Sequence, residues 1–193
     1  MAEHLAQVAQ YTVKENLTEK QIGQLILYSQ QDSLVRQFTS NAKRFQSREA
    51  YDKWVKERKV YVVSDIDGNL NGIAWFGRKS IPDKAYEQEF DLEEFGVTFA
   101  IRLYGSARGK GIARNFMEST IRLFKESPEY SQTTTRGIWL ETSNDNEPAK
   151  KLYLRCGFVQ VSQPDEKSKI VMIKKDKPLP ANQRAWHKPR VFS

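Results

Sequence analysis

The sequence predicts a single α/β domain of the α+β type, in which a mixed central sheet carries helices on both faces. With 193 residues, the chain is long enough for one full hydrophobic core and too short for two comfortable domains. Hydrophobic residues make up 39% of it, as in globular proteins with a real interior. Its segments follow one another as two helices, a hairpin, two strand–helix units and a closing hairpin, an order that predicts a mixed sheet.

Two helices are expected in the N-terminal third. Apolar residues recur with a helical period over residues 17–38, and Thr18 followed by Gln21 resembles a capping box at the start of that helix. Ser47 begins a second, shorter helix that extends through Val55.

The period then changes to that of β-strands. Residues 59–64 and 70–76 are β-rich and flank the turn pair Asp67-Gly68, which predicts a hairpin. Residues 85–95 are expected to form an acidic loop. Residues 96–104 alternate apolar and polar side chains and predict a third strand.

The second half continues with alternating helices and strands. Apolar residues of helical period predict a helix over residues 110–125. A strand at residues 137–142 precedes a helix at 147–155, which ends before Gly157, the residue type common just past a helix C-terminus. Residues 158–162 and 170–174 are expected to pair as the closing hairpin.

The net charge of +7 is concentrated at the C-terminus. From Lys174 onwards six basic residues stand against one acidic residue, so that stretch accounts for five of the seven net positive charges. We therefore divide the chain into a domain at residues 1–175 and a basic, proline-containing extension at residues 176–193. Charge carried by an extension argues against a nucleic-acid partner for the folded domain.

Membrane insertion and secretion are not predicted. The sequence has no run of about 18 apolar residues, and residues 1–10 lack the pattern of a secretory signal. Its one cysteine, Cys156, cannot form an internal disulfide, and His4 and His187 form no metal cluster. A cytoplasmic protein without a metal is expected.

A glycine-rich turn at residues 108–113 is the first candidate site. Gly109 and Gly111 remove side chains where a helix begins, so a diphosphate could approach the unpaired amides of the first helical turn. Basic residues add positive charge there, namely Arg108, Lys110 and Arg114. The spacing fits neither a Walker loop nor a dinucleotide fingerprint, and a solvated glycine-rich linker remains the alternative.

A second motif lies about forty residues further on. Arg108-x-x-Gly111-x-Ala113 and the later run, Glu141, Asn146, Ala149 and Tyr153-x-x-x-Gly157-Phe158, together resemble the GNAT superfamily of N-acyltransferases. This resemblance covers roughly residues 95–161. It implies the GNAT fold, with a mostly antiparallel sheet of six to seven strands and a splay between the fourth and fifth strands.

The resemblance also implies where acetyl-CoA, the co-substrate, binds. Its pantetheine arm enters the splay between residues 97–104 and 137–142 and pairs with main-chain groups along Ile101, Arg102 and Leu103. An amide near Leu103 polarises the thioester carbonyl, and Asn146 contacts the arm, besides being a helix N-cap. The implied cofactor-binding set is completed by the turn and by the tyrosine of the second motif: Arg108, Gly109, Lys110, Gly111, Ile112, Ala113, Arg114 and Tyr153.

Two residues are the catalytic candidates. Tyr153, at the motif position of the family's acid, would protonate the departing CoA thiolate, and its alternative role is that of a half-buried aromatic. Glu141 would take the proton of an incoming ammonium through a water, provided that partial burial raises its pKa. A register slip of one residue would instead make it a solvated edge residue.

The acceptor is the least determined part. The function expected is transfer of an acetyl or short acyl group to a primary amine of a small molecule or protein, by direct attack in a ternary complex. A non-catalytic acyl-CoA-binding or sensing module is the alternative, and a homodimer is possible. The acids at 87–94 could attract a cationic amine or form a solvated loop, and Trp75 and Phe76 are candidates for the pocket wall or for the core.

Overall fold

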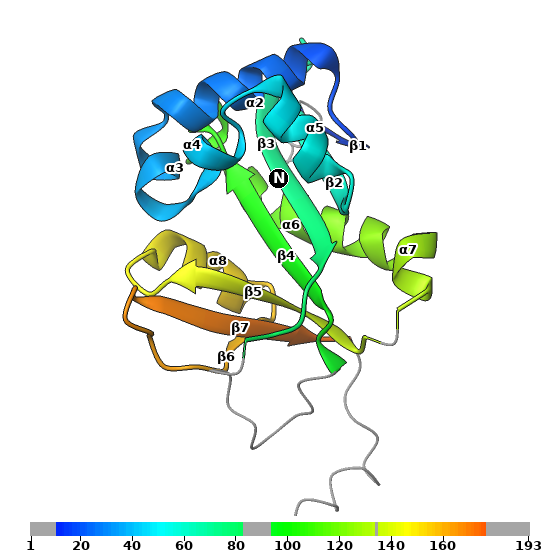
Figure 1. Ribbon diagram of the computed structural model, residues 1–193, viewed down its shortest axis with the longest axis vertical. Coiled ribbons are helices and arrows are strands. Elements are labelled where there is room, and N and C mark those ends of the chain that lie inside the picture. The colour runs from blue at the N-terminus through cyan, green and yellow to red at the C-terminus, as the bar shows by residue number, and fades with distance from the viewer. Residues whose placement is uncertain (1–10, 83–93, 134, 177–193) are drawn as a thin grey trace, which may run out of the picture.

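The described residues form a seven-stranded sheet with helices on both faces (Figure 1). The computed structural model of the chain describes residues 11–82, 94–133 and 135–176. The strand order is β1-β2-β3-β4-β5-β7-β6. The strands are β1 Thr12–Glu15, β2 Arg58–Ser64, β3 Leu70–Arg78, β4 Val97–Leu103, β5 Gly137–Ser143, β6 Val159–Gln160 and β7 Lys169–Lys175.

Antiparallel pairing dominates the sheet. Both predicted hairpins are present, as β2 with β3 and as β6 with β7. The β4 and β5 strands, by contrast, run parallel. The predicted fold class, a mixed and mostly antiparallel sheet of six to seven strands, is therefore confirmed.

The helices divide between the two faces of the sheet. On one face, α2 to α5 cover side chains of β2 and β3 such as Val60, Val62 and Ile73. On the other, α6 and α8 cover side chains such as Phe76, Phe99 and Leu140. The helices are α2 Glu19–Gln31, α3 Ser33–Phe38, α4 Asn41–Arg44, α5 Arg48–Val55, α6 Ile112–Lys125, α7 Pro128–Ser131 and α8 Glu147–Arg155.

The helix expected at residues 17–38 is two helices, so that prediction is wrong in its extent. Its predicted capping box exists, since Gln21 N–H donates to Thr18 Oγ1 and Thr18 N–H donates to Gln21 Oε1. The break falls at Asp32, whose backbone is extended. Asp32 accepts a hydrogen bond from Val35 N–H through its side chain and so starts α3.

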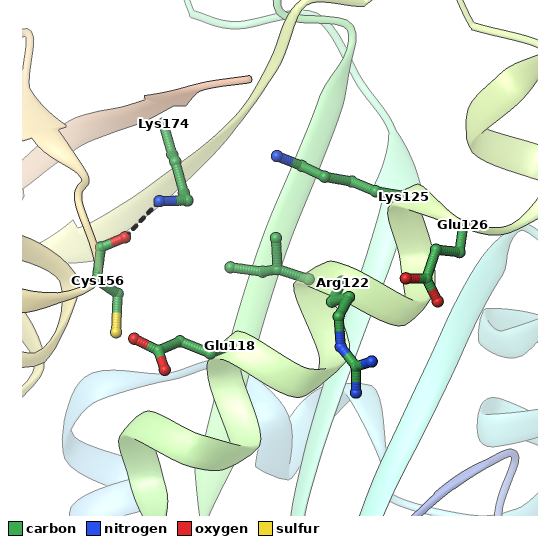
Figure 2. A pocket seen from close by; sticks show the side chains of 7 residues that line it. Glu118, Arg122, Lys125, Glu126, Cys156 and Lys174 are labelled. Carbon is green, nitrogen blue, oxygen red and sulfur yellow. Dashed lines mark hydrogen bonds between the residues drawn. The ribbon is translucent and has the colours of Figure 1, made fainter. Parts of the chain in front are cut away.

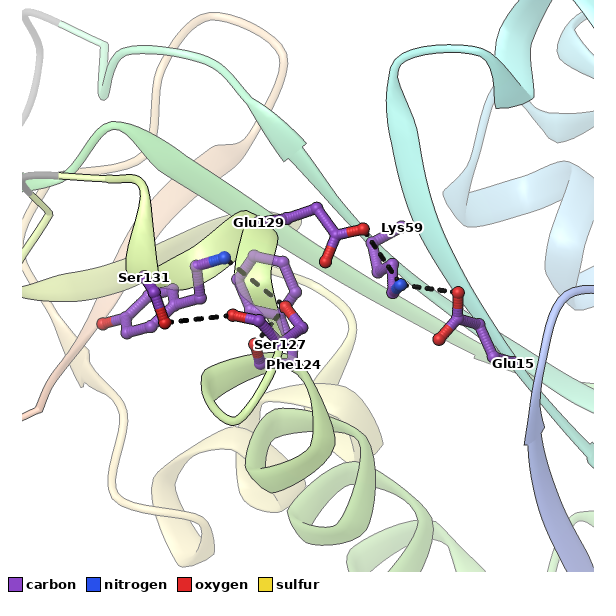
Figure 3. Close-up of polar contacts among 7 residues, drawn as sticks. Glu15, Lys59, Phe124, Ser127, Glu129 and Ser131 are labelled. Carbon is purple, nitrogen blue, oxygen red and sulfur yellow. Dashed lines mark hydrogen bonds and ion pairs between the residues drawn. The ribbon is translucent and has the colours of Figure 1, made fainter.

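Strand β1 and helix α4 are among the short elements that were not predicted. Strand β1 has a mostly exposed sequence, Thr-Val-Lys-Glu, because it lies at the edge of the sheet and buries little. Lys59 links β1 to α7, because its ammonium pairs with Glu15 on β1 and with Glu129 on α7, as Figure 3 shows. Helix α4 has four residues, too few to give a periodic pattern.

Across the described ranges, we find no helix with the length and apolar character needed to cross a bilayer.

Candidate functional site

The central feature of the site is the separation of β4 from β5. Within the described residues, Thr98 and Trp139 form the one parallel pair between these strands. Beyond it the strands diverge, as Figure 1 shows. The splay predicted between the fourth and fifth strands is therefore present.

One edge of β4 directs main-chain groups into this splay. Tyr104 N–H donates to Asn71 O at 2.9 Å. Every second residue back along β4 from Tyr104, beginning with Arg102, therefore directs its main-chain groups toward β3. The intervening residues, Ile101 and Leu103 among them, direct their main-chain N–H and C=O groups toward β5. The Ile101 carbonyl accepts a hydrogen bond from Arg102 Nη1 at 2.6 Å.

The glycine-rich turn connects this strand to α6. Gly109 and Gly111 have φ angles of +75° and +73°, in the left-handed region that favours glycine. Helix α6 begins at Ile112, two residues later than predicted, and its N-cap Gly111 offers no side-chain acceptor to the first-turn amides. A Cβ at either glycine would meet nothing within 4 Å, so there is open space beside the turn at both positions.

The three predicted cations of the turn differ in their surroundings. Arg108 pairs with Asp32, with Nη2 and Oδ2 2.8 Å apart. Arg114 pairs with Glu118 one helical turn further on, at 2.8 Å between Nε and Oε1. Lys110 is exposed. Lys110 and Arg114 also line a hollow of about 560 Å³ beside the start of α6, together with Tyr11 and Val13.

Helix α8 carries two of the predicted residues. Asn146 Oδ1 accepts a hydrogen bond from Ala149 N–H at 3.3 Å, which makes Asn146 an N-cap. Tyr153 is buried, with its ring centroid 5.9 Å from that of Phe158. Burial raises the pKa of the Tyr153 hydroxyl, and the nearby guanidinium of Arg102 opposes that rise.

Glu141 projects from β5 on the face opposite the α6–α8 core. Its neighbour Leu140 belongs to that core, whereas Trp139, two residues before Glu141, packs on the other face. The Glu141 side chain is exposed, so the partial burial expected for it is not found. By strand alternation Arg102 projects from this same face on the other side of the splay.

The two candidate wall residues, Trp75 and Phe76, lie on opposite faces of β3. Phe76 is part of the core, where it stacks on Phe124 with 3.9 Å between ring centroids. Trp75 instead faces the layer formed by α2 to α5. Of the acidic loop, residues 87–93 lie outside the described residues, while Glu94 pairs with Arg136 at 3.1 Å.

A second hollow lies between α6, Cys156 at the C-terminal end of α8, and Lys174 on β7 (Figure 2). Cys156 is buried at its edge, and burial raises the pKa of this thiol. Lys174 Nζ donates to the Cys156 carbonyl at 2.6 Å, which satisfies an acceptor at the end of α8. Among the residues that the structure describes, no three His, Cys, Asp or Glu side chains gather as metal ligands.

The structure also forms a cluster of charged side chains that sequence reasoning did not predict. Arg44 and Arg102 lie 58 positions apart in the sequence, yet both contact the ring of Trp75. Arg58 lies against the neighbouring ring of Trp54. No motif or periodicity in the sequence indicates this cluster, because its members come from three different elements.

Comparison with known proteins gives one family and many similar folds. The model of the "Acetyltransferase (GNAT) family" matches residues 27–158, which include both motifs. No curated protein sequence matches the chain.

Three solved structures illustrate the likeness. Spermidine N-acetyltransferase from Vibrio cholerae, in complex with CoA and spermine, has a TM-score of 0.60 at 18% identity, over 86% of this chain and 94% of that one. Ribosomal-protein-S5-alanine acetyltransferase from Vibrio fischeri has a TM-score of 0.63 at 15% identity, over 88% and 96%. AAC(6')-Ib, with paromomycin and acetyl-CoA, has a TM-score of 0.61 at 17% identity, over 93% and 99%. At these identities the likeness concerns the fold.

Proposed function

The chain belongs to the GNAT family of acetyltransferases, and on this basis we propose that it transfers an acetyl or short acyl group from acyl-CoA to a primary amine. The observation that carries the proposal is the splay between β4 and β5, next to a glycine turn at which α6 begins without a side-chain cap. Bound acyl-CoA supplies a thioester whose carbonyl carbon the amine attacks directly. The solved structures named above include acetyltransferases with CoA or acetyl-CoA.

The turn and the splay suit the two ends of the co-substrate. First-turn amides of α6, from Ile112 to Arg114, have no partner within the helix and lie at its positive end. Together with Lys110 they would hold a diphosphate. In the splay, the carbonyl of Ile101 and the main chain of Leu103 would pair with the pantetheine arm. An N–H of the arm would share the Ile101 carbonyl with Arg102 Nη1 or take the place of that group.

A main-chain amide at the end of β4 would stabilise the charge that develops on the thioester oxygen. Leu103 is the candidate, since its N–H is directed toward the splay. A donor fixed in the strand needs no reorganisation when the charge forms, and one such donor is typically worth about 3–4 kcal/mol in the transition state.

Tyr153 would supply the proton to the leaving sulfur. Its pKa lies above the usual value because the hydroxyl is buried, so at neutral pH it is protonated and able to donate. Arg102 links the hydroxyl to the splay: its guanidinium lies close to Tyr153 and donates to the Ile101 carbonyl. As the C–S bond breaks, the proton of Tyr153 passes to sulfur.

Glu141 would act on the other reactant. It projects on the face from which Arg102 also projects, across the splay. An ammonium must lose a proton before nitrogen can form the new C–N bond, and an exposed carboxylate can take that proton through a water.

The replacement Tyr153→Phe tests the proposal. We expect a large loss of CoA-thiol release with an amine acceptor, while the dissociation constant for CoA changes little. The ring of Tyr153 packs against Phe158, so the phenylalanine keeps that contact, and the loss of unfolding free energy should be limited to what the hydroxyl contributes beside Arg102. Unchanged turnover would remove Tyr153 as the acid, and CoA binding by a protein with no turnover on any amine would favour a binding module instead.

A further inference from the structure

Three arginines converge on an aromatic wall beside the splay, and we refer to them as the arginine cluster: Arg44 on α4, Arg58 on β2 and Arg102 on β4. The guanidinium carbons of Arg44 and Arg102 lie 5.5 and 5.4 Å from the ring centroid of Trp75. That of Arg58 lies 5.6 Å from the ring of Trp54, which meets Trp75 edge-on at 5.3 Å. Three positive charges therefore share one small region.

Within the described part of the chain, no carboxylate pairs with Arg44 or Arg102. Arg44 donates to two neutral oxygens, Asn41 Oδ1 at 2.9 Å and Ser40 Oγ at 3.4 Å. Burial, together with the charges of Arg102 and Arg58, lowers the pKa of Arg44 to about 10. Like charges held together in this way favour an anion between them.

Among the described residues, Arg58 has only a weak carboxylate partner, besides the neutral Trp54 carbonyl to which its Nη1 donates at 3.2 Å. Its Nη1 lies 3.6 Å from Glu57 Oε2, beyond hydrogen-bond distance, and the Glu57 side chain is 86% exposed. A solvated pair of this kind neutralises little of the charge that Arg58 adds to the cluster.

Arg102 also holds an unsatisfied donor. Its Nε is buried and has no hydrogen-bond partner. A buried donor without a partner costs folding free energy unless a ligand accepts its hydrogen bond. The guanidinium is planar, and its parallel donors match the two oxygens of a carboxylate. The unpaired charges and the unpaired donor therefore point to the same chemistry.

The cluster lies where an acceptor would have to bind. Arg102 is next to the Ile101 carbonyl in the splay and close to Tyr153. Counting along the parallel strands from the pair of Thr98 with Trp139, Glu141 is level with Ala100, two residues before Arg102 and on the same face. An anion held by Arg44 and Arg102 would leave the rest of a small molecule beside Glu141.

We propose that Arg44 and Arg102 bind a carboxylate of the acceptor, and that the acceptor is therefore a small amine that carries a carboxylate, such as an amino acid. This inference rests on the acyl transfer proposed above and narrows its acceptor. It also predicts that polyamines are poor acceptors, because three arginines repel a polycation.

The experiment compares matched acceptors and matched variants. Each of a set of amino acids is offered as the free acid and as its methyl ester, which keeps the amine and removes the negative charge, and spermidine is added as a polycation. CoA-thiol release is measured with the wild-type protein, with Arg44→Gln and with Arg36→Gln. Arg36 is exposed on the neighbouring helix α3, so its replacement removes the same charge away from the cluster.

Calorimetric titration of the free acids, with CoA present, gives a second readout that does not depend on turnover. Thermal unfolding of each variant shows whether it is folded. We expect the wild type and Arg36→Gln to favour at least one free acid over its ester. Arg44→Gln should lower kcat/KM and affinity for that acid about 10- to 100-fold, the usual range for a lost charge-assisted hydrogen bond, and leave the ester unchanged.

The outcomes separate the two proposals. Acetylation of esters or spermidine in preference to the acids, or a preference that survives Arg44→Gln, would overturn the carboxylate site and leave acyl transfer intact. Binding of the acids without thiol release would support the site and count against the proposed reaction. If the protein neither binds nor acetylates any free acid, the proposed carboxylate site is overturned.

Discussion

Replacing Gly111 separates the two roles that the turn should have, in folding and in binding CoA. Gly111 is the N-cap of α6 with φ at +73°, and a Cβ there meets no neighbour within 4 Å. Alanine would therefore cause no steric clash, and its penalty should come from the backbone alone. The left-handed conformation disfavours an L-residue by about 1–2 kcal/mol, so Gly111→Ala should lower the free energy of unfolding by that amount.

Gly111→Asn should behave differently. Asparagine tolerates the left-handed region and is a favourable N-cap residue, so its loss of unfolding free energy should be well under 1 kcal/mol. Both variants, however, place a side chain in front of the first-turn amides. If these amides hold the diphosphate, both should bind CoA more weakly, by about tenfold or more for each 1.4 kcal/mol lost.

The assays are urea unfolding and calorimetric titration with CoA. Gly105→Ala is the matched control, because Gly105 precedes the same helix, lacks a left-handed φ and also has open space around it. We expect it to change neither quantity. The reasoning fails if Gly111→Asn binds CoA as tightly as the control, or if Gly111→Ala is as stable as the wild type.

Two further predictions concern the sheet. Gly137→Ala should lower the free energy of unfolding by about 2–3 kcal/mol in urea titrations, because the new Cβ would come within 2.6 Å of both Lys174 O and Phe95 Cε1 and force the backbone apart; a loss no greater than that of Gly105→Ala would contradict this. Lys59→Met should cost about 1 kcal/mol at neutral pH. Burial lowers the pKa of Lys59, but Glu15 and Glu129 raise it, and the net pKa lies above the usual value. The stability that the wild type gains from the charged Lys59 should therefore be complete below about pH 10.4, the unfolded pKa, and should be lost as the pH rises through the folded pKa. The free energy of unfolding of the wild type and of Lys59→Met, measured from pH 7 to 11, checks this. A difference between the two proteins that grows with pH would refute it.

Much of the fold was predictable because its signals are local. The capping box at Thr18 and Gln21, the turn at Asp67-Gly68 and the glycine after α8 each act within a few residues of their own position. The break at Asp32 was missed because the apolar pattern continues through it, and only the side-chain cap on Val35 shows where one helix ends and the next begins.

The site was predictable in part for the same reason. Gly109 and Gly111 form the turn before α6 that the motif predicts, and the strands on either side of the splay are where the sequence places them. The exposure of Glu141 and the pairing of Arg108 with Asp32 depend on tertiary contacts. The arginine cluster depends on them entirely, because Arg44, Arg58 and Arg102 meet only after α4, β2 and β4 have packed together.

The most direct test of acyl transfer is the release of CoA thiol from acetyl-CoA by the wild-type protein, with the acetylated amine identified by mass spectrometry. Offered a panel of amines that includes amino acids, the protein should release thiol and form one molecule of N-acetyl product for each thiol released. Tight CoA binding without amine-dependent thiol release from any acceptor class would contradict the account.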